Sequence, residues 1–174
     1  MKKIKQLGKI GFLALALTFA SCSSDSEGDP IGVAGDGTIT ASVEGTTVTT
    51  LQSGTFGYVT GSGASKALQL TGSDATGKAF TLQVLGYTGV ATYNVNASNG
   101  PLAVLTYTAL DLNNPQNTNN TWVSGGDGTT GTLTVTEYTD AVVKGTFSFK
   151  GVNQAGTFKQ ISNGSFNVAL NQQQ

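Results

Sequence analysis

The chain has 174 residues, nine lysines against ten acidic residues, one cysteine, no histidine and no arginine. The lack of histidine and the single cysteine exclude Ser–His and Cys–His catalysis and zinc sites built from imidazoles or several thiolates. Four of the lysines lie within residues 1–9 and the other five are scattered, so the rest of the chain lacks the basic clusters that hold nucleic acid, which makes nucleic acid a poor partner.

Residues 1–21 have the pattern of a bacterial export signal. Four lysines precede an apolar run, Ile10–Ala20, and the small residue Ser21 follows it. The run has 11 residues, whereas a transmembrane helix needs about 20. We therefore expect a cleaved signal peptide rather than a permanent span.

Cys22 directly follows this segment. The run Leu17–Cys22 (LTFASC) resembles a bacterial lipobox, in which the cysteine takes a diacylglycerol and becomes the new N-terminus. An unused exposed thiol would be a liability in an exported protein. We predict lipidation of Cys22 and stable attachment through two or three acyl chains; the alternative is an ordinary signal peptide with a cysteine near the cut.

Cleavage would leave 153 residues with five lysines and ten acidic residues, a net charge of −5. This is the length of a single domain. Residues 22–37 are acidic and rich in glycine, which predicts a flexible tether. The acidic start of the tether resembles the stretch behind the lipid cysteine in surface-exported Bacteroidota lipoproteins, although a plain solvated linker has the same composition.

Residues 38–170 are predicted to form one all-β domain, followed by a disordered tail at 171–174. Apolar residues alternate with threonine, serine, glutamine and asparagine, as half-buried antiparallel strands require. The alternating apolar positions are, in chain order, Ile39/Ala41/Val43, Leu68/Leu70, Phe80/Leu82/Val84, Tyr93/Val95, Ala103/Leu105/Tyr107/Ala109, Leu133/Val135, Val143/Phe147/Phe149 and Phe166/Val168/Leu170.

Turn-forming residues separate these runs at short intervals. They lie at Gly61–Gly63, Asp74–Gly77, Gly86–Gly89, Asn99–Pro101, Gly125–Gly128, Asn153–Gly156 and Asn163–Gly164. Short strands with frequent turns predict an antiparallel β-sandwich or up-and-down β-barrel of about nine or ten strands, mostly a meander. The sequence leaves sandwich and barrel open.

A Gly–hydroxyl–Phe triplet occurs at Gly54–Phe56, Gly145–Phe147, Gly156–Phe158 and Gly164–Phe166. Its irregular spacing is not that of a repeat protein. We interpret each copy as a glycine at a strand entry or bulge, followed by an inward-facing aromatic ring.

The longest polar gap, Asp111–Gly128, contains the only tryptophan, Trp122. Long loops without structure of their own are often functional, and an exposed indole can stack on a sugar or a partner. Trp122 is therefore the candidate binding residue. The alternative is that it caps the core beneath the loop.

The sequence gives only weak evidence for catalytic carboxylates or a calcium site. Glu137 and Asp140 could form a glycosidase carboxylate pair, but they flank a predicted hairpin turn. Gly-Asp-Gly-Thr occurs at Gly35–Thr38 and Gly126–Thr129 without the ligand spacing of a calcium loop, which indicates ordinary Asp-Gly turns. We predict no catalytic residue, no metal site and no cofactor.

The segments Gly131–Tyr138, Val143–Phe149 and Ile161–Val168, with the opening run Ile39–Gly45, resemble a family of uncharacterised Bacteroidota (flavobacterial) lipoproteins. These proteins have a β domain of unknown function behind a lipobox. The resemblance implies an envelope location and a β fold, and it supplies no activity or catalytic residue.

We accordingly expect an outer-membrane lipoprotein on the periplasmic face or the cell surface, with the acidic tether favouring the surface. It would be a non-catalytic module that binds a glycan or an envelope protein. The alternatives are a structural coat lipoprotein without a ligand and a β-barrel carrier of a small apolar ligand.

Overall fold

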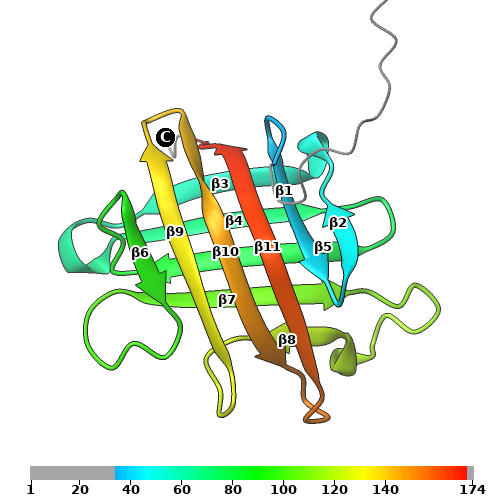
Figure 1. Ribbon diagram of the computed structural model, residues 1–174. Helices are drawn as coiled ribbons and strands as arrows, with labels where there is room; N and C mark the ends of the chain where they lie inside the picture. Colours follow the sequence, from blue (N-terminus) through cyan, green and yellow to red (C-terminus); the bar gives the residue numbers. More distant parts are fainter. Residues whose placement is uncertain (1–33, 172–174) are drawn as a thin grey trace, which may run out of the picture.

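The computed structural model describes residues 34–171 (Figure 1). The expectations for the signal peptide and for Cys22 lie outside these residues, as do those for residues 22–33 of the predicted tether 22–37 and for residues 172–174 of the predicted tail 171–174. The strands are β1 (Thr38–Val43), β2 (Thr46–Thr49), β3 (Thr55–Thr60), β4 (Ala67–Ser73), β5 (Lys78–Leu85), β6 (Ala91–Asn94), β7 (Leu102–Ala109), β8 (Thr121–Val123), β9 (Thr130–Tyr138), β10 (Val142–Val152) and β11 (Phe158–Ala169). Three short 3-10 helices accompany them: η1 (Gln52–Gly54), η2 (Gly63–Ser65) and η3 (Thr118–Asn120). Within residues 34–171, no helix is long and apolar enough to cross a membrane.

The strands form one sheet in the order β2-β1-β11-β10-β9-β6-β7-β5-β4-β3, and β8 pairs with both β10 and β7. Neighbouring strands are antiparallel except β6 and β7. A second parallel contact, a bridge, joins Gly57 of β3 to Leu170, and the Asn171 amide donates to the Gly57 carbonyl at 2.8 Å. The sheet therefore curls into a small closed barrel, with β1 and β2 as outer strands.

Two layers enclose the core. Strands β9, β10, β11 and β1 run steeply across β3, β4, β5 and β7 behind them (Figure 1). The alternating apolar positions face the space between the layers, as predicted: Leu68, Phe80 and Leu105 are completely buried, and in the whole set only Ala109 and Leu170 are partly exposed. Each buried large side chain of this kind contributes about 1.5–3 kcal/mol of transfer free energy.

A row of aromatic rings fills the interior. Phe149 lies 6.5 Å from Phe147, Phe147 lies 5.7 Å from Phe80, and Phe80 lies 5.4 Å from Tyr107, measured between ring centroids. Tyr107 in turn stacks on Trp122 at 5.9 Å. Aromatic pairs at these separations add to the stabilisation from buried area, so side chains rather than a hollow occupy this part of the barrel.

The predicted turn at Asn163–Gly164 is wrong, because both residues lie within β11. The register between β1 and β11 shifts between Thr40 and Ser42, so Asn163 and Gly164 share the place opposite Ala41. This is a β-bulge, and Asn163 takes the left-handed conformation with φ of 50°. A Cβ on Gly164 would lie 2.6 Å from a β10 carbonyl oxygen, which explains the glycine.

The Gly–hydroxyl–Phe interpretation is right for two copies and wrong for two. Phe147 and Phe166 are buried inside, whereas Phe56 and Phe158 are 43% and 45% exposed. At Phe56 the reason is its neighbour Gly57, whose backbone lies so close to the Leu70 side chain that a Cβ would be 2.6 Å away. Gly57 therefore holds the inward place and Phe56 points outward.

The described chain has eleven strands rather than nine or ten. The additional strands are short, and β8 lies in the segment 111–128 that was expected to be irregular. That segment contains η3 and β8, so it is tied to the barrel at Trp122 and its neighbours.

Candidate functional site

Trp122 is buried, with 8% of its surface exposed. Strand β8 carries it against β7, where it pairs with Tyr107, and the Lys159 ammonium lies 4.6 Å from its ring centre. Among the residues that the structure describes, the indole N–H has no hydrogen-bond partner. The structure thus places Trp122 at the edge of the core, where its ring is covered by protein and is not presented to a ligand.

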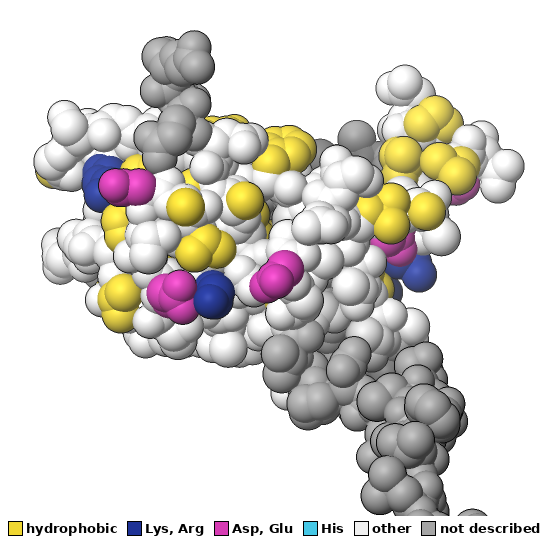
Figure 2. Space-filling model, turned by 90° about the horizontal axis from the view of Figure 1, so that it is seen from above, with side chains coloured by type: hydrophobic (Ala, Val, Ile, Leu, Met, Phe, Trp, Pro, Cys, Tyr) yellow, Lys and Arg dark blue, Asp and Glu magenta, His cyan; other side chains and the backbone are white. Residues whose placement is uncertain are grey.

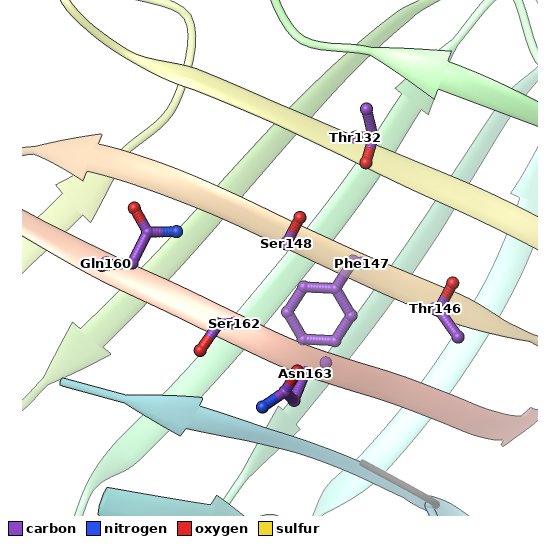
Figure 3. A pocket seen from close by; sticks show the side chains of 8 residues that line it. Thr132, Thr146, Phe147, Ser148, Gln160, Ser162 and Asn163 are labelled. Atoms are coloured by element: carbon purple, nitrogen blue, oxygen red, sulfur yellow. The ribbon is translucent and has the colours of Figure 1, made fainter. Parts of the chain in front are cut away.

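A polar groove of about 460 Å³ lies on the outer face of β9, β10 and β11. Figure 3 shows its lining side chains along the three strands. The groove is lined by Thr132 of β9, by Thr146, Phe147 and Ser148 of β10, and by Gln160, Ser162, Asn163 and Gly164 of β11. None of these side chains is charged.

Strand alternation explains why polar groups face the groove. On β10, Phe147 and Phe149 point into the core, so Thr146 and Ser148 point outward. On β11 the bulge interrupts the alternation and leaves Asn163 exposed at the surface. The hollow therefore depends on the register of these strands as well as on their composition.

Most of the lining side chains are free to bind. Among the residues that the structure describes, five polar side chains of the lining form no hydrogen bond: Thr132, Thr146, Ser148, Ser162 and Asn163. The Gln160 side chain is the exception, since its amide donates to the carbonyls of Phe149 (3.3 Å) and Ile161 (3.2 Å). Elsewhere on the barrel, outward hydroxyls pair with each other, as in Thr92–Thr134 at 3.0 Å and Thr108–Thr121 at 3.2 Å. The groove thus concentrates unused donors and acceptors in one place.

A second hollow of about 310 Å³ adjoins the groove at Thr146 and extends to Ala34. Ser165 lines it and is 6% exposed, and its hydroxyl has no hydrogen-bond partner within residues 34–171. Lys144 also lines it, and its ammonium is paired with the Glu137 carboxylate at 3.0 Å. This end of the polar face therefore carries a neutralised charge and one buried, unsatisfied hydroxyl.

Phe158 and Lys150 lie beyond the other end of the groove. Phe158 is on the same side of β11 as Gln160, and the Lys150 ammonium lies 4.1 Å from its ring centre. The Gly-Thr-Phe triplet predicts an inward ring at Phe158, so this residue was not among the candidate site residues. The alternation around buried Ile161 would have placed Phe158 and Gln160 together on the outer face.

Glu137 and Asp140 occupy a hairpin, as the sequence predicted. β9 ends at Tyr138 and β10 begins at Val142, and the Thr139 hydroxyl accepts a hydrogen bond from the Val142 amide at 3.0 Å. Glu137 is bound to Lys144 by the ion pair described above. Glu137 and Asp140 thus belong to a turn and its flanking strand rather than to a cleft.

Both Gly-Asp-Gly-Thr copies form the same turn. In each, the threonine amide and hydroxyl donate to the carbonyl of the first glycine, Gly35 or Gly126. The third residue, Gly37 or Gly128, has φ of 73°, a value that favours glycine. No group of three or more potential metal-ligating side chains occurs between residues 34 and 171.

A cluster of tyrosines lies at another end of the barrel. Tyr87 is buried and packs edge-on against Tyr138 at 5.3 Å, and the Lys66 ammonium lies over both rings. Burial raises the pKa of the Tyr87 hydroxyl far above its ordinary value, and nearby Tyr93 and Tyr138 add to the shift. Tyr87 is therefore a neutral packing residue at physiological pH.

Charge is sparse on the face of the molecule that is seen from above. Most of this face is uncharged polar or backbone surface, with a few acidic and basic groups, some of them side by side, and small apolar patches (Figure 2). Such a surface suits hydrogen bonding to a neutral ligand more than binding to a polyanion.

Comparison of the chain with family models, with curated proteins and with solved structures finds no match. The family resemblance stated above therefore stays a prediction. The groove on β9, β10 and β11 is the feature from which a function can be argued.

Proposed function

We propose that the protein is a non-catalytic glycan-binding module, held in the cell envelope by lipid on Cys22. The observation that carries the binding proposal is the groove on the outer face of β9, β10 and β11. Five of its lining side chains have hydroxyl or amide groups without a partner in the described structure. We expect these groups to bind sugar hydroxyls.

The chemistry of the groove favours a glycan over a protein partner. Sugar hydroxyls both donate and accept, and so do serine, threonine and asparagine side chains. Each such hydrogen bond contributes about 0.5–1.5 kcal/mol net. Protein interfaces usually centre on buried apolar or aromatic anchors, whereas the middle of this groove is polar, with Ser148 and Ser162 facing outward.

The proposed location rests on the sequence of residues 1–37. Gly37 donates to the Asn167 carbonyl at 2.8 Å, near the end of β11, while Phe158 is at its start. The tether thus joins the barrel at one end of the polar face. We infer an outer-membrane lipoprotein of the Bacteroidota type whose groove is displayed at the cell surface, the periplasmic face being the alternative.

For the architecture we propose an antiparallel barrel built largely as a meander, rather than an open sandwich. Supporting this is the contact of β3 with the end of β11 through Gly57 and Leu170. Most pairs join consecutive strands, and the main exceptions are β1 with β11, β5 with β7 and β6 with β9.

A glycan array probed with the full chain, purified in detergent, tests the binding proposal. The test variant is Ser148→Ala/Asn163→Gly, since glycine keeps the left-handed backbone that Asn163 adopts. The control is Gln83→Ala, on β5 and away from the groove lining. Losing two hydrogen bonds should weaken binding about tenfold or more, while the control binds like the wild type.

Two results would contradict glycan binding: an array with no bound glycan, or equal binding by the double variant and the wild type with unchanged melting temperatures. The anchor is tested separately by growing cells with an alkyne-labelled fatty acid. We expect label on the wild-type chain and none on Cys22→Ser, and equal labelling of both would contradict lipidation at this residue.

The structural-coat alternative is favoured by one observation, the burial of Trp122, because that reading expects no exposed aromatic in the segment 111–128. It predicts an empty glycan array and a high copy number in the envelope. The apolar-carrier alternative requires space inside the barrel. Phe147, Phe149 and Phe166 are buried there and Phe147 packs against Phe149, which speaks against this alternative.

A further inference from the structure

Two lysines of β10 bracket the groove. The outward residues of this strand run from Lys144 through Thr146 and Ser148 to Lys150. Ser148 pairs with Thr132 of β9 in the row that crosses the groove. Lys150 is the next outward residue on the same strand, so its side chain leaves the backbone just beyond the lining of the groove.

The two lysines differ in their partners. Lys144 is neutralised by Glu137 at 3.0 Å. Lys150 has no carboxylate within ion-pair distance in the described part of the chain, although Asp127 lies in the neighbouring turn next to Gly128. At one end of the groove Lys144 is compensated by Glu137; at the other end Lys150 has no ion-pair partner in the described chain, and the Glu44 carboxylate accepts from the Gln160 backbone amide.

Phe158 determines where the Lys150 charge lies. The ammonium is 4.1 Å from the centre of the ring, within the range of a cation–π interaction. Phe158 and Gln160 lie on the same face of β11, and Gln160 pairs with Lys150 across the strands while it lines the groove. The ring therefore fixes the ammonium at Phe158, two residues along β11 from Gln160, which lines this end of the groove.

We propose that the groove takes an acidic glycan, with a carboxylate or sulfate of one sugar unit bound by the ammonium of Lys150. This proposal rests on the glycan-binding function proposed above. The unused hydroxyl and amide groups bind the sugar hydroxyls, and Lys150 selects the charged unit. Phe158 is a positioning residue that holds the ammonium.

The net charge of the chain favours a short acidic glycan over a long polyanion. After removal of residues 1–21 the chain has a net charge of −5, so a long polyanion meets repulsion over most of the surface. A short acidic oligosaccharide needs only the local positive charge. We expect its selectivity to decrease as salt rises, because the ion pair is at the surface.

The experiment measures affinity for two matched pairs of ligands by calorimetry with the full chain. One pair is an oligogalacturonate and its methyl ester, and the other is a sulfated galactan oligosaccharide and its desulfated form. We expect the acidic member of one pair to bind about fivefold to tenfold more tightly. The pair that shows the preference identifies carboxylate or sulfate as the recognised group.

Three variants assign the preference to Lys150. Lys150→Met keeps an unbranched side chain on the Phe158 ring and removes the charge, so the preference should vanish while the neutral member still binds. Phe158→Leu should reduce the preference. Lys144→Met is the matched control and should retain it, since Lys144 is already paired with Glu137.

The outcomes separate the two proposals. Equal affinity of wild type for the acidic and neutral members of both pairs overturns the acidic-glycan proposal and leaves glycan binding standing. A preference that Lys150→Met retains also overturns it. No binding to either pair, together with an empty array, overturns both. If Lys150→Met fails to fold, a wild-type preference that persists at high salt contradicts the proposed ion pair.

Discussion

The ammonium of Lys159 lies 4.6 Å from the ring centre of Trp122, and the same indole stacks on Tyr107 at 5.9 Å. Trp122 is the only tryptophan of the chain, so its fluorescence reports this one place. We predict emission typical of a buried indole, little quenching by acrylamide in the folded state, and a red shift on unfolding.

The same packing predicts a large cost for removing the ring. Trp122→Ala should lower the free energy of unfolding by about 3–5 kcal/mol, measured by urea denaturation with circular dichroism. Tyr58→Ala, at a partly exposed position of β3, serves as a control with a smaller loss. Strong acrylamide quenching of wild-type Trp122 would show that the indole is accessible after all.

Gly145 is predicted to be irreplaceable. A Cβ at this position would lie 2.0 Å from the Thr134 carbonyl oxygen and 2.5 Å from the Phe166 ring. Because backbone cannot move aside cheaply, Gly145→Ala should cost at least about 3 kcal/mol, the upper end for an overpacked core. Gly126→Ala is the control, since its Cβ would meet only the Val152 side chain at an ordinary 3.6 Å. Equal melting temperatures for the two variants would contradict this prediction.

Thr50 supplies a buried hydroxyl to the backbone of β1. Its Oγ1 accepts from the Ile39 amide at 2.9 Å and lies 2.6 Å from the Thr55 hydroxyl. Thr50→Val would leave the buried Ile39 amide without this partner, at a cost of about 1–3 kcal/mol. The exposed Thr47→Val on β2 is the matched change, and we expect it to be nearly neutral. Urea denaturation of both variants gives the comparison.

Asp74 makes the stability depend on pH. Burial alone would raise the pKa of this carboxyl. The hydrogen bonds that it accepts from the Lys78 amide and from the Thr76 hydroxyl and amide, together with the attraction of the Lys78 ammonium, outweigh burial and lower the pKa below its ordinary value. Its contribution is therefore complete above the unfolded-state pKa of about 3.9 and is lost as pH falls through the lowered folded-state value.

Asp74→Ala should therefore destabilise the protein by about 1 kcal/mol at pH 7 and by less at pH 2, where the wild-type carboxyl is protonated. Asp127→Ala, in another turn, controls for removal of an acidic residue. Urea denaturation at both pH values checks the prediction. A larger loss at pH 2 than at pH 7 would have the wrong sign for a carboxyl with a lowered pKa.

Much of the fold could be predicted from the sequence because its period of two is regular. Positions such as Phe80, Leu105 and Leu133 alternate with polar residues, and all three are completely buried. Strand β8 was not predicted, because three residues inside a long polar segment are too few to show an alternation of apolar and polar side chains. The bulge at Asn163 was not predicted because Asn-Gly also favours a hairpin turn. Only the close approach of β10 to Gly164 distinguishes a bulge from a turn at this place.

The candidate site was less predictable than the core. The sequence pointed to Trp122 because an isolated tryptophan in a polar segment has the composition of a binding loop. The groove instead combines Thr132, Ser148 and Ser162, which are unremarkable in any one strand. They meet because β10 pairs with β9 on one side and with β11 on the other, at registers that bulges set. A single sequence does not specify such registers.

The closure of the barrel has a consequence for the order in which the chain folds. Strand β1 pairs with β11, and Asp36 accepts a hydrogen bond at 2.7 Å from Asn167, 131 positions later. The contact of Gly57 with Leu170 completes the ring only after that residue has been made. Contacts so distant in sequence form slowly. The barrel of a chain still on the ribosome therefore cannot close before residue 170 has emerged.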